Sequence, residues 1–194
     1  MKTIKRISTA AFLLASALMF NVQAQTQAQI SEPSRFNLSV GPEIGLPVGD
    51  LSDRYEWSLG GSVELEYLFD NGLGITLNTG VYNLFAEDGG YKLDGKNYTD
   101  DLQVLPVKLG LKYFVIGGLY IQGEAGAAFL LNKEDGGYDK STAFTYAPQV
   151  GYRFDMGNNQ FIDAGVKWMG STKFNDNGIS NNMLGLRLAY GFGL

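Results

Sequence analysis

Hydrophobic and polar residues alternate with a period of two along most of the chain after residue 35. In one such segment, Leu65 and Tyr67 fall on one face while Glu64 and Glu66 fall on the other. A period of two is typical of β-strands, because successive side chains of a strand point to opposite faces. The pattern predicts eight strands, at residues 36–46, 57–69, 73–85, 105–113, 119–131, 144–155, 162–168 and 184–194.

The lengths of the strands and of their connections carry a second signal. Most predicted strands span about 10 to 13 residues, whereas ordinary strands have about 5–6 and bilayer-crossing strands need about 9–11. Short turns at 70–72, 116–118 and 156–159 alternate with long polar loops at 47–56, 86–101, 132–142 and 171–182. This alternation is typical of outer-membrane barrels with short periplasmic turns and long extracellular loops. We therefore expect an all-β, eight-stranded antiparallel up-and-down transmembrane barrel.

The polar face of these strands carries charges of both signs and many glycines. A narrow lumen must pair its charges, because an unpaired buried charge is costly, and glycine makes room for neighbouring side chains. We expect a luminal ion-pair lattice made of Glu43, Glu64, Glu66, Lys108, Lys112, Glu124, Arg153, Asp155, Asp163, Lys167 and Arg187. The expected partners are Glu43 with Arg187, Glu124 with Lys108, Lys112 or Arg153, Asp163 with Arg153 or Arg187, and Glu64 and Glu66 with Lys108 and Lys112.

The apolar face carries aromatic residues near both ends of the strands. Near the short turns lie Phe36, Tyr67, Phe69, Tyr113, Phe154, Tyr190 and Phe192, and near the long loops lie Trp57, Phe85, Phe129, Phe144 and Trp168. Two aromatic girdles around an aliphatic band are typical of membrane barrels, and closure follows because lipid tolerates no unpaired sheet edge. A soluble lipocalin-like barrel, with its apolar face inside, is the alternative; it leaves the girdles unexplained.

The first 24 residues have the pattern of a secretory signal peptide. Lys2, Lys5 and Arg6 precede an apolar stretch at 10–20, and small residues at 22–24 suit cleavage after Ala24. We expect a signal peptide at 1–24, a periplasmic lead-in at 25–34 and the barrel domain at 35–194. Cleavage would remove three of the 15 basic residues and none of the 20 acidic ones, so the net charge would fall from −5 to −8.

The amino-acid composition excludes several kinds of catalytic and metal-binding site. The chain has 26 Gly, no Cys and no His, so disulfides, thiolate chemistry, Cys-based zinc sites and His-based catalysis are excluded. An acidic exported chain is not expected to bind nucleic acid. Glu64 and Glu66 could in principle serve as an acid/base pair, but an ion-pair lattice is the simpler interpretation. We expect no enzymatic activity, no cofactor and no bound metal.

From Phe36 to Leu194 the chain resembles the small eight-stranded outer-membrane β-barrels, such as the OmpA transmembrane domain, OmpX and the opacity proteins. Residues 45–51 (GLPVGDL), 59–61 (LGG) and 64–67 (ELEY) are similar to barrel domains common in Bacteroidota. The resemblance implies residence in the cell outer membrane, contact with lipid and lipopolysaccharide, and insertion by the barrel assembly machinery. It also implies an assembly signal at the end of the chain: Arg187, Ala189, Phe192 and Leu194.

The long loops are the remaining surface for function. Glu-Asp-Gly-Gly-Tyr occurs in loop 86–101, at 87–91, and again in loop 132–142, at 134–138. The simplest interpretation of these motifs is that their glycine pairs form hairpin turns. The alternative is that their acidic residues form a rim that contacts a surface partner or binds a divalent cation. We expect a monomer with a structural or surface-contact role. A narrow ion or small-solute channel is the alternative, although an eight-stranded lumen is barely wider than its own side chains.

Overall fold

The computed structural model describes residues 34–86, 91–93, 96–98, 101–131, 142–172 and 181–194. The predicted signal peptide, nearly all of the lead-in and much of the long loops lie outside these residues. Among the described residues, no helix is long and apolar enough to span a membrane. The elements are β1 (Phe36–Val48), η2 (Gly49–Leu51), β2 (Tyr55–Leu68), β3 (Leu73–Ala86), β4 (Tyr91–Leu93), β5 (Lys96–Tyr98), β6 (Leu102–Ile116), β7 (Leu119–Leu130), β8 (Thr142–Gly157), β9 (Gln160–Ser171) and β10 (Asn181–Gly193).

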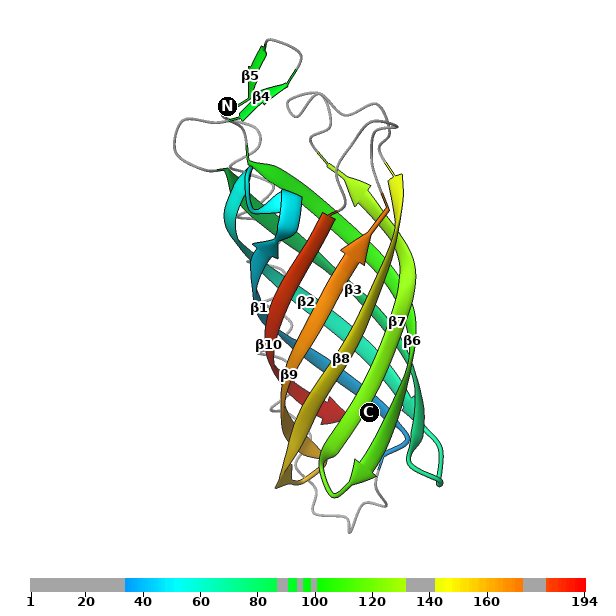
Figure 1. Ribbon diagram of the computed structural model, residues 1–194. Helices are drawn as coiled ribbons and strands as arrows, with labels where there is room; N and C mark the ends of the chain where they lie inside the picture. Colours follow the sequence, from blue (N-terminus) through cyan, green and yellow to red (C-terminus); the bar gives the residue numbers. More distant parts are fainter. Residues whose placement is uncertain (1–33, 87–90, 94–95, 99–100, 132–141, 173–180) are drawn as a thin grey trace. The chain divides into compact units, whose positions relative to one another are not determined.

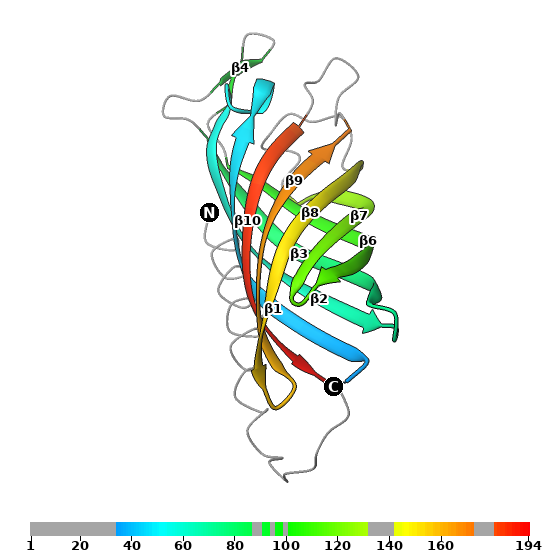
Figure 2. The same ribbon diagram turned by 60° about the horizontal axis from the view of Figure 1, so that its bottom comes forward.

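Eight long antiparallel strands form a closed barrel in the order β1-β10-β9-β8-β7-β6-β3-β2, which confirms the predicted fold (Figure 1). The first and last strands close it, with Glu43 of β1 opposite Arg187 of β10. In both views β1, drawn in blue, lies beside β10, drawn in red (Figure 2). Every barrel strand therefore has two hydrogen-bonded neighbours, and no long edge is left unpaired, as a bilayer requires.

Most of the strands begin or end a few residues beyond their predicted limits. β1 runs to Val48 and β2 starts at Tyr55, so the predicted loop 47–56 shrinks to 49–54 and contains the short helix η2. The connection between β3 and β6 contains a small two-stranded sheet, β4 and β5, which the alternation did not predict. Both differences have one cause: hydrophobic periodicity marks the buried and exposed faces, whereas hydrogen bonding continues into more polar sequence.

Tight turns connect β2 to β3, β6 to β7 and β8 to β9, as predicted. Asn158 and Asn159 have φ values of 53° and 56°, so the last of these turns has positive φ at both central residues. Such turns follow the twist of the flanking strands, and asparagine tolerates this conformation better than most residues. Gly117, with φ of 55°, plays the corresponding part between β6 and β7.

The barrel carries its apolar side chains on the outside. Leu109, Leu111 and Ile121 are among the large hydrophobic residues exposed on the outer face, while Lys108, Lys112 and Gln122 on the same strands are buried inside. The soluble lipocalin-like alternative is therefore wrong, since it requires the opposite arrangement. An apolar outer surface of this kind is stable in lipid, where no hydrophobic surface meets water.

Candidate functional site

The inside of the barrel is filled by ten charged side chains, five acidic and five basic. They come from seven of the eight barrel strands, and each occupies an inward-facing position of the strand alternation. All are buried, with relative exposures of 1–8%. Among the described residues, this luminal charge network consists of Glu43, Glu64, Glu66, Lys108, Lys112, Glu124, Arg153, Asp163, Lys167 and Arg187.

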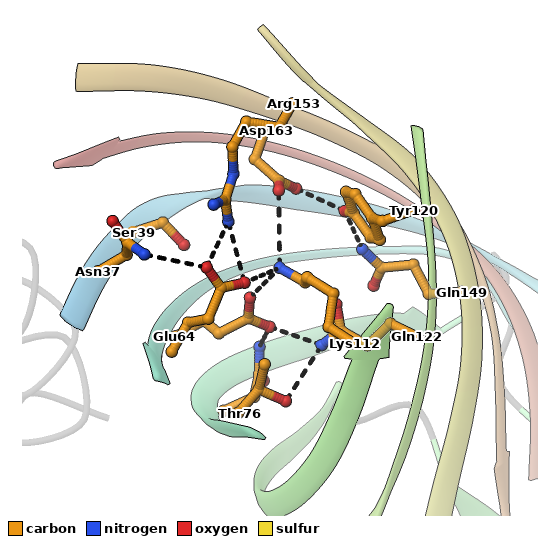
Figure 3. Close-up of polar contacts among 12 residues, drawn as sticks. Asn37, Ser39, Glu64, Thr76, Lys112, Tyr120, Gln122, Gln149, Arg153 and Asp163 are labelled. Atoms are coloured by element: carbon orange, nitrogen blue, oxygen red, sulfur yellow. Dashed lines mark hydrogen bonds and ion pairs between the residues drawn. The ribbon is translucent and has the colours of Figure 1, made fainter. Parts of the chain in front are cut away.

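Lys112 is the centre of one half of the network. Its Nζ lies 2.7 Å from Oε1 of Glu64, 3.0 Å from Oε2 of Glu66 and 3.7 Å from Oδ2 of Asp163. Glu64 and Glu66 come from β2, whereas Asp163 comes from β9, which β1 and β10 separate from β2 around the barrel. Figure 3 shows Glu64 and Asp163 converging on the Lys112 ammonium group. A single β6 side chain thus neutralises charges on β2 and β9 that would otherwise repel each other.

Glu43 is the centre of the other half. Its carboxylate forms ion pairs with Lys167 and, at 3.4 Å, with Nε of Arg187. It also accepts hydrogen bonds from the hydroxyl groups of Tyr82 at 2.6 Å and Ser62 at 2.5 Å. These contacts use the lone pairs of both oxygens, which is the condition for holding a carboxylate away from water.

Arg187 joins the two halves. Its Nη1 lies 3.3 Å from Oδ1 of Asp163, and its Nη2 donates to the Ser39 hydroxyl at 2.9 Å. Because Asp163 also faces Lys112, the ion pairs run without interruption from Glu43 to Glu66. The planar guanidinium suits this linking position, since its donors point in several fixed directions.

Arg153 lies at the end of the network that faces the short turns. Its Nη2 donates to both carboxylate oxygens of Glu66, at 2.7 and 2.9 Å. Its guanidinium carbon lies 4.0 Å from the ring centre of Phe161 and 4.7 Å from that of Phe114. An arginine between two aromatic rings gains cation–π attraction in addition to its ion pair.

Lys108 and Glu124 form an ion pair nearer the long connections. Gln122 joins this pair to the Lys112 cluster, because its Nε2 donates to Oε1 of Glu124 at 3.0 Å and to Oε2 of Glu64 at 2.8 Å. Gln122 is an uncharged bridge between two carboxylates, and its hydrogen bonds reduce their repulsion. Figure 3 shows its bond to Glu64.

Tyr120 fits among these charges because glycines lie beside it. Its hydroxyl donates to Oδ1 of Asp163 at 2.7 Å and accepts from Nε2 of Gln149 at 2.6 Å. A Cβ atom at Gly151 would lie 2.3 Å from that hydroxyl oxygen, and one at Gly165 would lie 2.6 Å from Nε2 of Gln149. The luminal glycines therefore make space for specific polar side chains, as the sequence predicted in general terms.

The network is neutral and almost fully paired across the lumen. In the described part of the chain, four buried side-chain atoms have no hydrogen-bond partner: Asn78 Oδ1, Gln122 Oε1, Arg153 Nε and Asp163 Oδ2. Across the same residues, no group of three or more His, Cys, Asp or Glu side chains is arranged to hold a metal ion. The arrangement can support a sealed, rigid barrel; it presents no exposed nucleophile or acid/base pair.

Ten of the eleven predicted luminal charges lie in the network, and Asp155 does not. Asp155 is exposed, because the strand register shifts between Asp155 and Gly157 and three consecutive residues, Phe154 to Met156, face outward or toward solvent. A bulge of this kind breaks the alternation on which the prediction depended. The predicted pairs of Glu43 with Arg187, Glu124 with Lys108 and Asp163 with Arg187 are present. The predicted cross-lumen pairs of Glu64 and Glu66 with Lys112 are present as well. The pairs of Lys167 with Glu43 and Arg153 with Glu66 were not predicted.

Sequence reasoning missed the apolar part of the inner face. Tyr82, Leu84 and Leu102 are buried inside the barrel beside Leu51 and Leu130, toward the long connections. Tyr82 and Leu84 continue the inward parity of Thr76 and Asn78 along β3. The two-residue period alone places both residues on the inner face.

The predicted aromatic residues lie on the outer face in two groups. Trp57 stacks on Phe85 with ring centres 4.3 Å apart, and Phe36 packs on Tyr67 at 4.8 Å. All are exposed or half-buried: Phe36, Trp57, Phe69, Tyr113, Phe129, Phe144, Phe154 and Trp168 are exposed, and Tyr67, Phe85, Tyr190 and Phe192 are half-buried.

The predicted assembly signal is divided between the two faces of β10. Arg187 and Ala189 point inward and are buried, while Phe192 and Leu194 lie on the outer side. The backbone N–H of Leu194 donates to the carbonyl of Phe36 at 2.8 Å, so the end of the chain is hydrogen-bonded to β1. Recognition by an insertion machinery remains a prediction.

The sequence matches the outer membrane protein beta-barrel domain over residues 11–192. The chain belongs to this family. It is therefore an outer-membrane β-barrel protein, as its closed barrel and apolar outer face require. A comparison with curated proteins found no significant match.

Three solved structures of outer-membrane proteins show the same fold. OprG of Pseudomonas aeruginosa has a TM-score of 0.52 at 13% identity, covering 83% of this chain and 96% of OprG. Ail of Yersinia pestis, in complex with the heparin analogue sucrose octasulfate, has a TM-score of 0.51 at 16% identity, covering 83% and 99%. AlkL, determined in DMPC lipid bilayers, has a TM-score of 0.51 at 16% identity, covering 88% and 96%. At these identities the similarity shows the fold alone.

Proposed function

We propose that this outer-membrane barrel is a sealed scaffold whose long connections act in contacts at the cell surface. The observation that supports the proposal is the luminal charge network, in which five acids and five bases are buried and paired across the barrel. A lumen filled in this way leaves the connections as the part of the protein that can meet another molecule.

A conductance measurement distinguishes the sealed scaffold from the alternative function, a narrow channel. We expect the protein in a planar lipid bilayer to give no open-pore current steps, because moving an ion through the lumen requires several buried ion pairs to separate. Lys112→Glu adds a fourth acid to the cluster around Glu64, Glu66 and Asp163 and serves as the test variant. Wild-type current steps whose size changes in K112E would favour the channel and overturn the scaffold.

The surface contact needs its own experiment. Lys92 lies in predicted loop 86–101 and Lys140 in loop 132–142, so trypsin added to intact cells should cleave near both if these loops face outward. A photo-crosslinking residue at Tyr91 or Tyr138 should then capture a surface molecule, while the same residue at Tyr190, near the opposite end, serves as the control. Capture at none of the loop positions, despite cleavage on intact cells, would contradict the contact role.

The remaining assignments are proposals that accompany this one. A cleaved signal peptide at 1–24, a monomeric state, contact with lipopolysaccharide and insertion by the barrel assembly machinery all follow from the family and the sequence pattern. The N-terminal sequence of the protein purified from outer membranes tests the first directly: it should begin at Gln25.

A further inference from the structure

A cavity of about 70 Å³ lies inside the barrel between the luminal charge network and the long connections. We call it the apolar pocket. Its walls come from η2, β3, β6, β7, β8, β9 and β10, and most of their side chains are hydrophobic. The principal wall residues are Leu51, Leu84, Leu102, Ala128, Met169 and Met183.

The floor of the apolar pocket is closed by the charge network. Lys108 lines the pocket but is held by its ion pair with Glu124. Tyr82 lines it too, and its hydroxyl donates to Glu43 at 2.6 Å. The pocket is therefore blind toward the short turns, so it can hold a ligand but does not continue into a channel.

Three polar side chains that line the apolar pocket, Lys108, Tyr82 and Thr145, are already engaged. The Ser58 hydroxyl donates to Sδ of Met183 at 2.9 Å, and the Thr145 hydroxyl donates to the carbonyl of Gly170 at 3.1 Å. The buried side-chain atoms without a partner in the described residues belong to other parts of the lumen. A polar ligand would lose its hydrogen bonds to water and find few replacements apart from the Ser171 hydroxyl, so the pocket favours an apolar one.

The volume narrows the class of ligand. The cavity of about 70 Å³ exceeds the roughly 10–15 Å³ that one water molecule needs and is smaller than an apolar cavity of about 150 Å³ that admits benzene. This space suits the narrow end of an unbranched chain better than a ring. Met169 and Met183 are unbranched and flexible, so the walls can adapt to such a chain.

We propose that the apolar pocket binds the end of a linear alkyl chain, which enters methyl group first. The chain can belong to a free alkane-like molecule or to the acyl tail of a lipid, since both present the same terminal methylene and methyl groups. This binding site goes beyond the proposed surface-contact role and does not depend on it.

Methionine methyl NMR can test the proposal, because the relevant reporters are already in place. Met169 and Met183 line the pocket, whereas Met156 lies 55% exposed at the far end of β8 and serves as the internal reference. The protein would carry ¹³C-labelled methionine methyl groups in nanodiscs of perdeuterated lipid, with protonated hexane added. We expect saturable nuclear Overhauser effects from hexane to Met183, which is shielded from lipid. In a second arm without hexane, protonated lipid would give the same effects only if its acyl tails occupy the pocket.

A matched pair of variants locates the binding. Ala128→Phe fills the pocket and should abolish the effects at Met183, whereas Ala127→Phe, at the adjacent outward position of β7, should leave them unchanged. Leu84→Ala enlarges the pocket and should lower the hexane concentration for half-saturation; it also keeps the test decisive if A128F does not fold. Absence of effects at Met183 in both arms, effects from water instead of hexane, or equal binding in L84A and the wild type would overturn the proposal.

Discussion

Toward the short turns, the inside of the barrel is filled by charged side chains, and toward the long connections it is filled by leucine, alanine and tyrosine. The strand β6 contributes to both halves, with Lys112 and Lys108 in the first and Leu102 in the second. The alternation of its side chains is the same throughout, so the strand geometry does not distinguish the halves. The halves differ in how a substitution lowers the free energy of unfolding. Removing one partner of a buried ion pair costs much because the other charge is left unpaired, whereas the cost of shortening an apolar side chain grows with the volume removed.

The largest expected effect comes from removing the ammonium group at the centre of the charged half. Lys112→Met leaves the carboxylates of Glu64, Glu66 and Asp163 without this partner. We expect a loss of about 3–5 kcal/mol in the free energy of unfolding, as for other broken buried ion pairs. Urea unfolding in lipid vesicles measures it, with Leu111→Met on the outer face as the control. Equal losses in K112M and L111M would show that the network is not a stabilising unit.

In the apolar half, the corresponding change removes volume. Leu102→Ala shortens a side chain that is 5% exposed within the apolar cluster, so it should cost roughly 2–5 kcal/mol through lost burial and the cavity left behind. Leu102→Met conserves the volume and should cost less than about 1.5 kcal/mol. The same unfolding measurement applies. A similar cost for both variants would mean that hydrogen bonding, and not packing, holds this half together.

A smaller effect should come from adding one methyl group to the charged half. Gly151→Ala would place a Cβ 2.3 Å from the Tyr120 hydroxyl and 2.8 Å from the Ala164 carbonyl. We expect a loss of about 1–3 kcal/mol, typical of overpacking. Gly123→Ala is the control, because its Cβ would meet nothing within 4 Å. If G151A is as stable as G123A, Tyr120 has more room than the structure indicates.

The smallest net effect should come from replacing both members of the ion pair at the boundary between the halves. Lys108→Met alone leaves the Glu124 carboxylate buried without its cation and should cost several kcal/mol, whereas the double variant K108M/E124M should lie close to the wild type. Gln122 keeps its hydrogen bond to Glu64 in either case. A double-mutant cycle measures the coupling; strict additivity of the single losses would contradict a direct pair.

Much of this arrangement could be predicted from residue identity and period. The two-residue alternation placed Glu64, Lys112 and Asp163 on one face. The need to pair buried charges predicted that Glu64 would meet Lys112 and that Asp163 would meet Arg187, whereas the contact of Asp163 with Lys112 was not predicted. Asp155 shows the limit of the method, because a bulge at the end of β8 turned it outward. A bulge depends on hydrogen bonding to the neighbouring strand, which the alternation of one strand does not contain.

The apolar pocket shows a second limit. Leu51 lies in η2, inside the predicted loop 47–56, and Leu102 lies at the start of β6, between the predicted loop 86–101 and the predicted strand 105–113. They became part of the inner face only because hydrogen bonding extended the strands and a short helix followed β1. Residue type alone does not predict that these leucines face the lumen, since leucine near a strand end is equally compatible with a lipid-facing position.

The sequence alone determined the class of structure: strands long enough for a bilayer, an apolar face for lipid, and a charged face whose signs nearly balance. It did so because side-chain period and bilayer thickness are local constraints, readable one strand at a time. Only the tertiary structure decided which charges pair, since Lys167 reaches Glu43 and Arg153 reaches Glu66 across the lumen. Those choices depend on strand register and on the stagger of the closed barrel, which bring side chains distant in sequence to the same height.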